Sequence, residues 1–121
     1  MITEDYVSFE TANLMKEKGF NWNTDKQFNL DKIVGDYNIT DRSRHPERYL
    51  DAPTLQMAMK WLREKHNLGV FPSWSQVFGL YGCRMYYLKK GSQEFYSVGV
   101  RYNTYEEACE AAIKYCLENL I

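Results

Sequence analysis

The side chains best suited to act as nucleophile, general base or metal ligand are three cysteines and two histidines: Cys83, Cys109, Cys116, His45 and His66. A small enzyme built from them would use His45 or His66 as the acid–base group and Cys83 as the nucleophile. The spacing gives little support, because the chain has no Cys-x-x-Cys pair and no closely spaced Cys/His set of the kind that binds zinc. We therefore favour a non-enzymatic protein and predict no catalytic residue, cofactor or metal ion.

Two of the cysteines, Cys109 and Cys116, lie seven positions apart in a predicted helix. Seven residues span about 10.5 Å along a helix, which exceeds the Cα separation of about 7 Å that a disulfide tolerates. We expect all three cysteines to be reduced and buried as small apolar side chains. The alternative is that one of them is a thiol nucleophile or a metal ligand.

Charge is distributed unevenly along the chain. The net charge is −1, yet residues 42–101 hold ten Lys and Arg against four Asp and Glu. This basic middle either matches the acidic ends within the fold or offers a basic face to a polyanion. We expect the most charged run, 41–48, to be a solvated surface loop. In the alternative, this loop would contact phosphate through Arg42, Arg44, His45 and Arg48.

Aromatic residues are abundant, with ten tyrosines, six phenylalanines and three tryptophans. These are more rings than one small core easily hides. Tyr and Trp suit interfaces because one end is apolar and the other can form a hydrogen bond. We expect a partner-binding surface on the outward face of a sheet, including Tyr86 or Tyr87 and Phe95. The ordinary alternative is that the rings cover two long helices.

The strongest helix prediction covers residues 104–121. Thr104 and Glu107 have the spacing of a capping box, in which the Thr104 hydroxyl accepts from the Glu107 amide and the Glu107 carboxylate reaches back to the Thr104 amide. Beyond the cap, apolar residues recur at spacings of three and four. The stripe comprises Tyr105, Cys109, Ala112, Ile113, Cys116, Leu117 and Leu120. We expect a sheet to cover this stripe.

A first helix is predicted from Ser8 to Lys18. Ser8 is a good N-cap, and Gly19 is placed as the left-handed residue that follows the helix. Phe20 would then contact Met15, as in a Schellman motif.

A second helix is predicted to open at residues 51–54, with Pro53 tolerated in its first turn, and to end at 67–69. Its expected buried side comprises Leu55, Ala58, Met59, Trp61 and Leu62. We expect His66 in its last turn to be structural or solvent-facing. Between the two helices, residues 21–49 predict an ordered loop or a short hairpin that Trp22 and Phe28 pin onto the core.

The region 70–101 is rich in strand-forming residues. Segments 84–89 and 94–101 flank residues 90–93, which form a credible hairpin connection. The residues expected to face the core are Tyr96, Val98 and Val100. A third strand is needed for a stable sheet, and the sequence leaves open whether it lies near residues 70–71 or within 76–81.

Length and composition fit a single α+β domain over residues 1–121. A chain of this size can bury one core, and its 45% hydrophobic and 26% charged residues are typical of a globular protein. Apolar runs are far shorter than the roughly 18 residues that span a membrane, and the acidic start does not suit a signal peptide. We expect a cytoplasmic protein with two helices, a small antiparallel sheet of about three strands and a C-terminal helix packed on it.

Three stretches, residues 2–12, 52–67 and 105–121, resemble a group of small uncharacterised proteins encoded by gut bacteria and by their phages and prophages. The resemblance implies no activity, cofactor or site residue. It implies only a mobile-element, cytoplasmic setting.

Our leading hypothesis is a phage- or prophage-associated accessory protein that binds a protein partner, either another protein or a second copy of itself. The alternative is a nucleic-acid-binding module, because helix, three strands and helix is also the order of double-stranded RNA binding domains. Against it, Glu106 and Glu107 stand where those domains place lysines, and they would repel phosphate. The basic residues that this alternative would use are Arg42, Arg44, Arg48, Lys89, Lys90 and Arg101.

Overall fold

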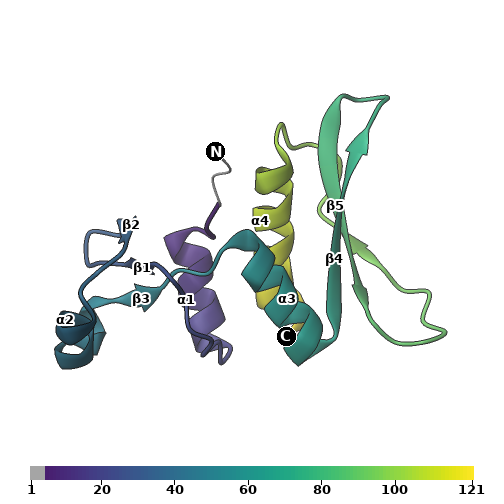
Figure 1. Cartoon of the computed structure of the whole chain (residues 1–121). Coiled ribbons are helices and arrows are strands. Elements are labelled where there is room, and N and C mark those ends of the chain that lie inside the picture. The colour runs from purple at the N-terminus through teal and green to yellow at the C-terminus, as the bar shows by residue number, and fades with distance from the viewer. Residues whose placement is uncertain (1–4) are drawn as a thin grey trace. The chain divides into compact units, whose positions relative to one another are not determined.

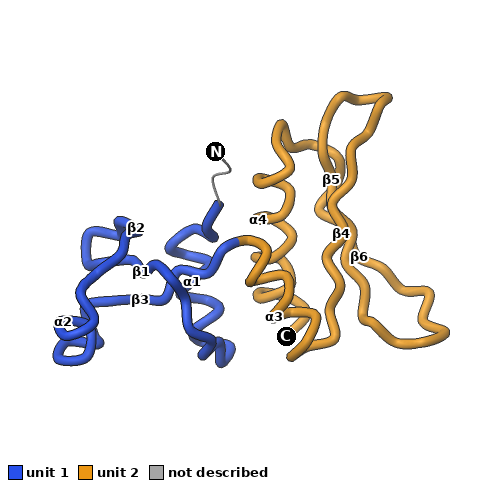
Figure 2. Tube along the Cα trace, in the orientation of Figure 1, with its two compact units in different colours: residues 1–54 blue, residues 55–121 orange. Residues whose placement is uncertain are grey.

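The computed structural model describes residues 5–121, and the chain divides into two compact units, residues 1–54 and 55–121 (Figure 2). The described part is α+β, as predicted, with four α-helices and two three-stranded antiparallel sheets, where the sequence predicted one sheet. The acidic start and the first part of the stretch 2–12 lie outside the described residues. That the whole chain forms one domain stays a prediction.

Unit 1 begins with helix α1, Phe9–Glu17, and both of its predicted ends are confirmed. The Ser8 hydroxyl accepts the amide of Thr11 at 3.1 Å. At the other end Gly19 has φ +97°, a conformation that glycine adopts without steric cost. The Phe20 amide then donates to the Met15 carbonyl at 2.9 Å, which is the defining bond of the Schellman motif.

The remainder of unit 1 contains the short hairpin that was one of the two expectations for residues 21–49. Strand β1, Gln27–Phe28, pairs with β2, Val34–Gly35, and on its other side with β3, Leu50–Asp51. Phe28 is buried, and its ring meets the ring of Phe9 edge to face at 5.5 Å between centroids. The ring of half-buried Trp22 lies 6.2 Å from that of Phe20.

The charged run 41–48 is not the loop that we predicted. Helix α2, Ile39–Arg44, and a 3₁₀ turn, Pro46–Arg48, contain most of it. Asn38 begins α2 by accepting the Thr40 amide at 2.8 Å, a capping signal that the sequence reading missed. Proline disfavours the helical region for the residue before it, and His45, which precedes Pro46, leaves that region with φ −131° and ψ 61°.

Unit 2 opens with helix α3, Leu55–His66. Its predicted inward side is confirmed, since Leu55, Ala58, Met59, Trp61 and Leu62 are all buried. We had expected Pro53 to lie in the first turn of this helix. This prediction is wrong, because Pro53 precedes the helix. Asn67, with φ +53°, ends the helix.

The sheet of unit 2 consists of β4, Leu68–Ser75, β5, Leu80–Tyr87, and β6, Tyr96–Ser97, in that spatial order. The open question about the third strand is thereby settled in favour of residues 68–75, and residues 76–79 form the connection between β4 and β5. The predicted hairpin between β5 and residues 94–101 forms with a shorter second strand than expected. Figure 1 shows α3 and α4 on the same side of the long β4–β5 hairpin.

Helix α4, Tyr105–Tyr115, continues into a π-helical turn, Cys116–Leu120. The Thr104 hydroxyl accepts the Glu107 amide at 3.1 Å and donates to the Glu107 carboxylate at 3.1 Å. The first bond of the predicted capping box, from the Glu107 amide to the Thr104 hydroxyl, is therefore present. The Glu107 carboxylate accepts from the Thr104 hydroxyl instead of from the Thr104 amide. The stripe is confirmed, because Cys109, Ala112, Ile113, Cys116 and Leu117 are fully buried.

The predicted inner face of residues 94–101 is only partly correct. Val98 is buried, whereas Val100 is 43% exposed. Gly99 has φ +85°, so the regular alternation of an extended strand is broken between the two valines. The chain then rejoins β5 through a bridge between Tyr81 and Tyr102.

Candidate functional site: the outer face of the unit 2 sheet

The antiparallel register brings together a set of residues on the face of the sheet opposite to its buried side chains. Buried Cys83 and Met85 point inward from β5, so Gly82, Arg84 and Tyr86 point outward. Across the ladder, Tyr86 lies opposite Gly69, and Arg84 lies opposite Phe71. We call this surface the outer face.

Three aromatic rings cross the outer face in a row. The centroids of Phe71 and Tyr86 are 5.4 Å apart, and those of Tyr86 and Phe95 are 6.4 Å apart, which are distances at which rings attract one another. Gly69 makes room for this row, since a Cβ there would lie 2.5 Å from Cε2 of Phe71. Phe71 is nevertheless 49% exposed and Phe95 is 54% exposed. Much ring surface is thus left for a ligand.

Arg84 is the cation of the outer face. Its guanidinium lies 5.2 Å from the centroid of the Phe95 ring, a favourable cation–π arrangement. Among residues 5–121, no carboxylate lies within ion-pairing distance of Arg84. Its positive charge is therefore not neutralised within the described part of the chain.

A hollow of about 350 Å³ lies beside Arg84. Ser73 and Ser97 line it from β4 and β6, and Gly82 lines it where Gly99 and Val100 approach the β5 backbone. Phe71, Tyr86 and Val100 are among the residues that line it, and none of its lining residues is acidic. The hollow can therefore receive a side chain that carries a negative charge or an apolar group.

Exposed apolar side chains also occur in the connection between β4 and β5, where Val77 is 86% and Phe78 70% exposed. Trp74, 52% exposed, belongs to the opposite, helix-bearing face, because its ring packs on Tyr81 and the Tyr81 ring meets Tyr105 of α4. The whole segment 68–83 contains no charged residue. This uncharged run is a signal that sequence reasoning missed, although the sequence displays it plainly.

Of the predicted pair Tyr86 and Tyr87, only Tyr86 belongs to the outer face. The Tyr87 hydroxyl donates to the carbonyl of Leu120 at 2.8 Å, and its ring meets that of Tyr96 edge to face at 6.2 Å. Burial raises the pKa of Tyr87. Its hydrogen bond anchors the C-terminal turn to the sheet, so its role is structural.

The predicted basic residues Arg42, Arg44 and Arg48 all belong to unit 1. Arg42 donates from Nε to the carbonyl of Tyr37 at 3.1 Å, while Arg44 and Arg48 are exposed. In the described part of unit 1, no hydrogen bond or ion pair gathers the three guanidinium groups at one point.

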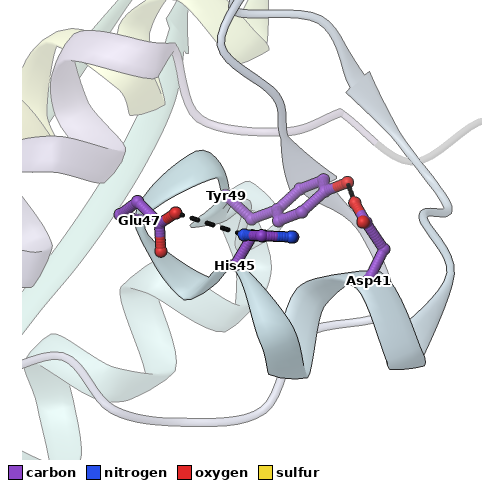
Figure 3. A network of polar contacts seen from close by, with 4 residues as sticks. All are labelled: Asp41, His45, Glu47 and Tyr49. Atoms are coloured by element: carbon purple, nitrogen blue, oxygen red, sulfur yellow. Dashed lines mark hydrogen bonds and ion pairs between the residues drawn. The ribbon is translucent and has the colours of Figure 1, made fainter.

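Polar contacts in the same part of unit 1 involve acidic partners (Figure 3). Tyr49 donates a hydrogen bond to Asp41, and His45 Nδ1 lies 3.5 Å from Glu47 Oε1. The hydrogen bond to Asp41 is the main reason that the pKa of Tyr49 is raised. The carboxylates of Asp41 and Glu47 weaken the case for a phosphate site here, because they would repel phosphate.

The three cysteines are buried and free, as predicted. Burial raises the pKa of Cys83 to about 12, of Cys109 to about 11 and of Cys116 to about 12. A thiol with such a pKa holds almost no nucleophilic thiolate near neutral pH. His66 packs edge-on against Trp61 at 4.7 Å, and burial lowers its pKa. These environments argue against a Cys83-based active site.

Residues 5–121 contain no group of three or more His, Cys, Asp and Glu side chains arranged to hold a metal ion. The described helices include none with the length and apolar character required to cross a bilayer. In comparisons with protein families, curated proteins and solved structures, the chain matches none.

Proposed function

We propose that this protein acts by binding another protein and that the outer face of the unit 2 sheet is its docking surface. The observation that carries the proposal is the row of rings on the outer face, Phe71, Tyr86 and Phe95, of which Phe71 is 49% and Phe95 54% exposed, beside a segment, 68–83, that contains no charged residue. The centres of protein interfaces are depleted of charged residues and enriched in aromatic residues and Arg. Contiguous exposed apolar patches typically mark such sites.

A phage- or prophage-associated accessory role remains part of this proposal and rests on the sequence resemblance alone. A second copy of the chain is one partner that this surface would suit, because homodimer interfaces are more apolar than transient ones.

Docking across the face suits this sheet better than addition of a strand at its edge. The Val98 amide donates to the Cys83 carbonyl at 3.1 Å, so the polar backbone groups of Cys83 point toward the β6 side. Pro72, opposite Cys83, therefore directs its nitrogen to the outer edge of β4. Since proline has no amide proton, it interrupts the row of donors that an added strand would need.

Nucleic-acid binding is the second candidate. Residues 68–103 contain four basic residues, Arg84, Lys89, Lys90 and Arg101, and one acidic residue, Glu94. Exposed rings on a sheet can also stack with bases. The uncharged segment 68–83 favours a protein partner, since surfaces that follow a phosphate backbone carry cations along their length.

The test is affinity capture from the native host with quantitative mass spectrometry, followed by titration calorimetry with each purified candidate. The variant Phe71→Ser/Phe95→Ser removes two exposed rings of the outer face. Ile33→Ser/Ile39→Ser is the matched control, because both residues are exposed apolar side chains of unit 1. We expect the first variant to bind the partner at least about tenfold more weakly than wild type. The control should bind it with unchanged affinity.

Light scattering after size-exclusion chromatography shows whether the partner is a second copy. Equal binding by wild type and the Phe71→Ser/Phe95→Ser variant would contradict the proposed surface. Tight binding of a single-stranded oligonucleotide, lost in that variant, would replace the protein partner with nucleic acid.

A further inference from the structure

The outer face combines an apolar surface with one cation, and that combination restricts the chemistry of the partner. The guanidinium carbon of Arg84 lies over the Phe95 ring, 5.2 Å from its centroid. A cation–π contact of this kind leaves N–H donors of the group available for a ligand. Those donors form a planar fork that matches the two oxygens of a carboxylate.

The hollow next to Arg84 supplies hydroxyl groups as well. Ser97 Oγ accepts the Gly99 amide at 3.0 Å, which leaves the hydroxyl proton of Ser97 available for an anion. Ser73 lines the same hollow from β4. Phe71 and Val100 provide apolar walls. A negative group at Arg84 and an apolar group beside it would therefore both find matching surroundings.

The number of cations in the hollow argues for a single carboxylate and against a run of phosphates. Arg84 is the only basic residue among those that line it. Lys89 and Lys90 line a different hollow, around the loop after β5. A nucleic-acid backbone requires several cations in series, whereas one Asp or Glu side chain requires one fork.

We infer that the outer face binds an acidic, apolar segment of its protein partner, with an Asp or Glu carboxylate on Arg84 and an adjacent apolar side chain in the hollow beside it. This inference rests on the proposed function and adds the chemistry of the ligand. The excess of basic residues in 68–103 would also draw an acidic segment toward the sheet through long-range attraction.

The experiment uses peptides of roughly 12 residues selected from a random display library on the full chain, with binding measured by fluorescence polarisation. We expect the selected peptides to carry Asp or Glu next to an apolar residue. Changing that acid to its amide should weaken binding by about tenfold. Arg84→Gln should weaken binding of the acidic peptide by a similar factor. The Arg84→Gln protein should bind the amide peptide only slightly more weakly than it binds the acidic peptide.

Two protein variants serve as controls. Arg101→Gln removes a cation that does not line the hollow and should retain binding. Arg84→Lys keeps the charge without the fork and should bind with intermediate affinity. Circular dichroism melts of each variant separate loss of binding from loss of folding.

The outcomes distinguish the inference from the proposed function. Selected peptides without acidic residues, or unchanged binding by Arg84→Gln, overturn the inference. If Phe71→Ser/Phe95→Ser still loses those peptides, the protein-binding surface stands. Peptides that bind both variants like wild type overturn both proposals. An oligothymidylate of about ten nucleotides serves as the nucleic-acid probe. If it displaces the peptides and its binding requires Arg84, the outer face binds nucleic acid, and this result also overturns both proposals.

Discussion

The close approach at Gly82 gives the sharpest test of the sheet that carries the outer face. An added Cβ at this position would lie 2.8 Å from the carbonyl oxygen of Gly99 and 2.9 Å from Cγ2 of Val100. The Gly99 carbonyl has little freedom to move, because the Val98 amide donates to Cys83 at 3.1 Å and the Arg101 amide donates to Tyr81 at 3.1 Å. Relief of the clash in Gly82→Ala would strain both bonds.

The size of the effect follows from three terms. Overpacking of this kind costs about 1–3 kcal/mol, and weakening a hydrogen bond costs up to about 1 kcal/mol. Replacing glycine by alanine returns about 0.4–1 kcal/mol by restricting the unfolded chain. We expect Gly82→Ala to lose about 2 kcal/mol of unfolding free energy, which lowers the melting temperature by roughly 8 °C in a chain of this size.

The assay is urea unfolding followed by circular dichroism, with thermal melts in parallel. Ser73→Ala is the matched control, because Ser73 lies directly opposite Gly82 in the ladder and is exposed. It should change stability by less than about 0.5 kcal/mol. A Gly82→Ala protein as stable as wild type would refute the close approach of residues 99–100 to β5.

Three further predictions concern the caps and the buried thiols. Thr104→Ala removes the acceptor for the Glu107 amide and should cost about 1 kcal/mol in urea unfolding, whereas Thr104→Ser should retain most of the stability. Gly19→Ala should also lower the free energy of unfolding by about 1 kcal/mol. The loss should come entirely from backbone strain, because nothing lies within 4 Å of an added Cβ. An unchanged urea midpoint would exclude the left-handed conformation at residue 19. Burial raises the pKa of the three thiols, Cys83, Cys109 and Cys116. Above pH 9 the unfolded chain therefore loses thiol protons that the folded chain keeps. The free energy of unfolding should consequently fall between about pH 9 and pH 12. The fall should be shallower in the triple Cys→Ala variant, and an identical pH dependence would contradict burial of the thiols.

Helix ends were predictable from the sequence because they depend on residues close together in the chain. Ser8 and Gly19 define α1 through bonds that span only a few positions. Thr104 begins α4 in the same way. The spacing of Cys109, Ile113 and Cys116 also identified the buried stripe without knowledge of what covers it. The helix α2 was missed because its cap, Asn38, lies in a segment without apolar periodicity.

The composition of the candidate site was visible in the sequence, but its geometry was not. The sequence contained Tyr86, Phe95 and an uncharged run over 68–83. The sequence did not decide whether Tyr86 or Tyr87 faces outward, since a shift of one residue in register exchanges the two faces of a strand. The pairing of Arg84 with Phe71, and the position of its guanidinium over Phe95, arise from strands that meet only in the folded chain.

Local chemistry thus determined the helices, their ends and the residues that had to be buried. Tertiary structure decided that residues 68–75 form the third strand, that Val100 turns outward after Gly99 and that three rings and one arginine share a face. The physical reason is that strand pairing is chosen by contacts between distant segments. Their register depends on the combined packing of both faces and on turns such as the one at Gly99.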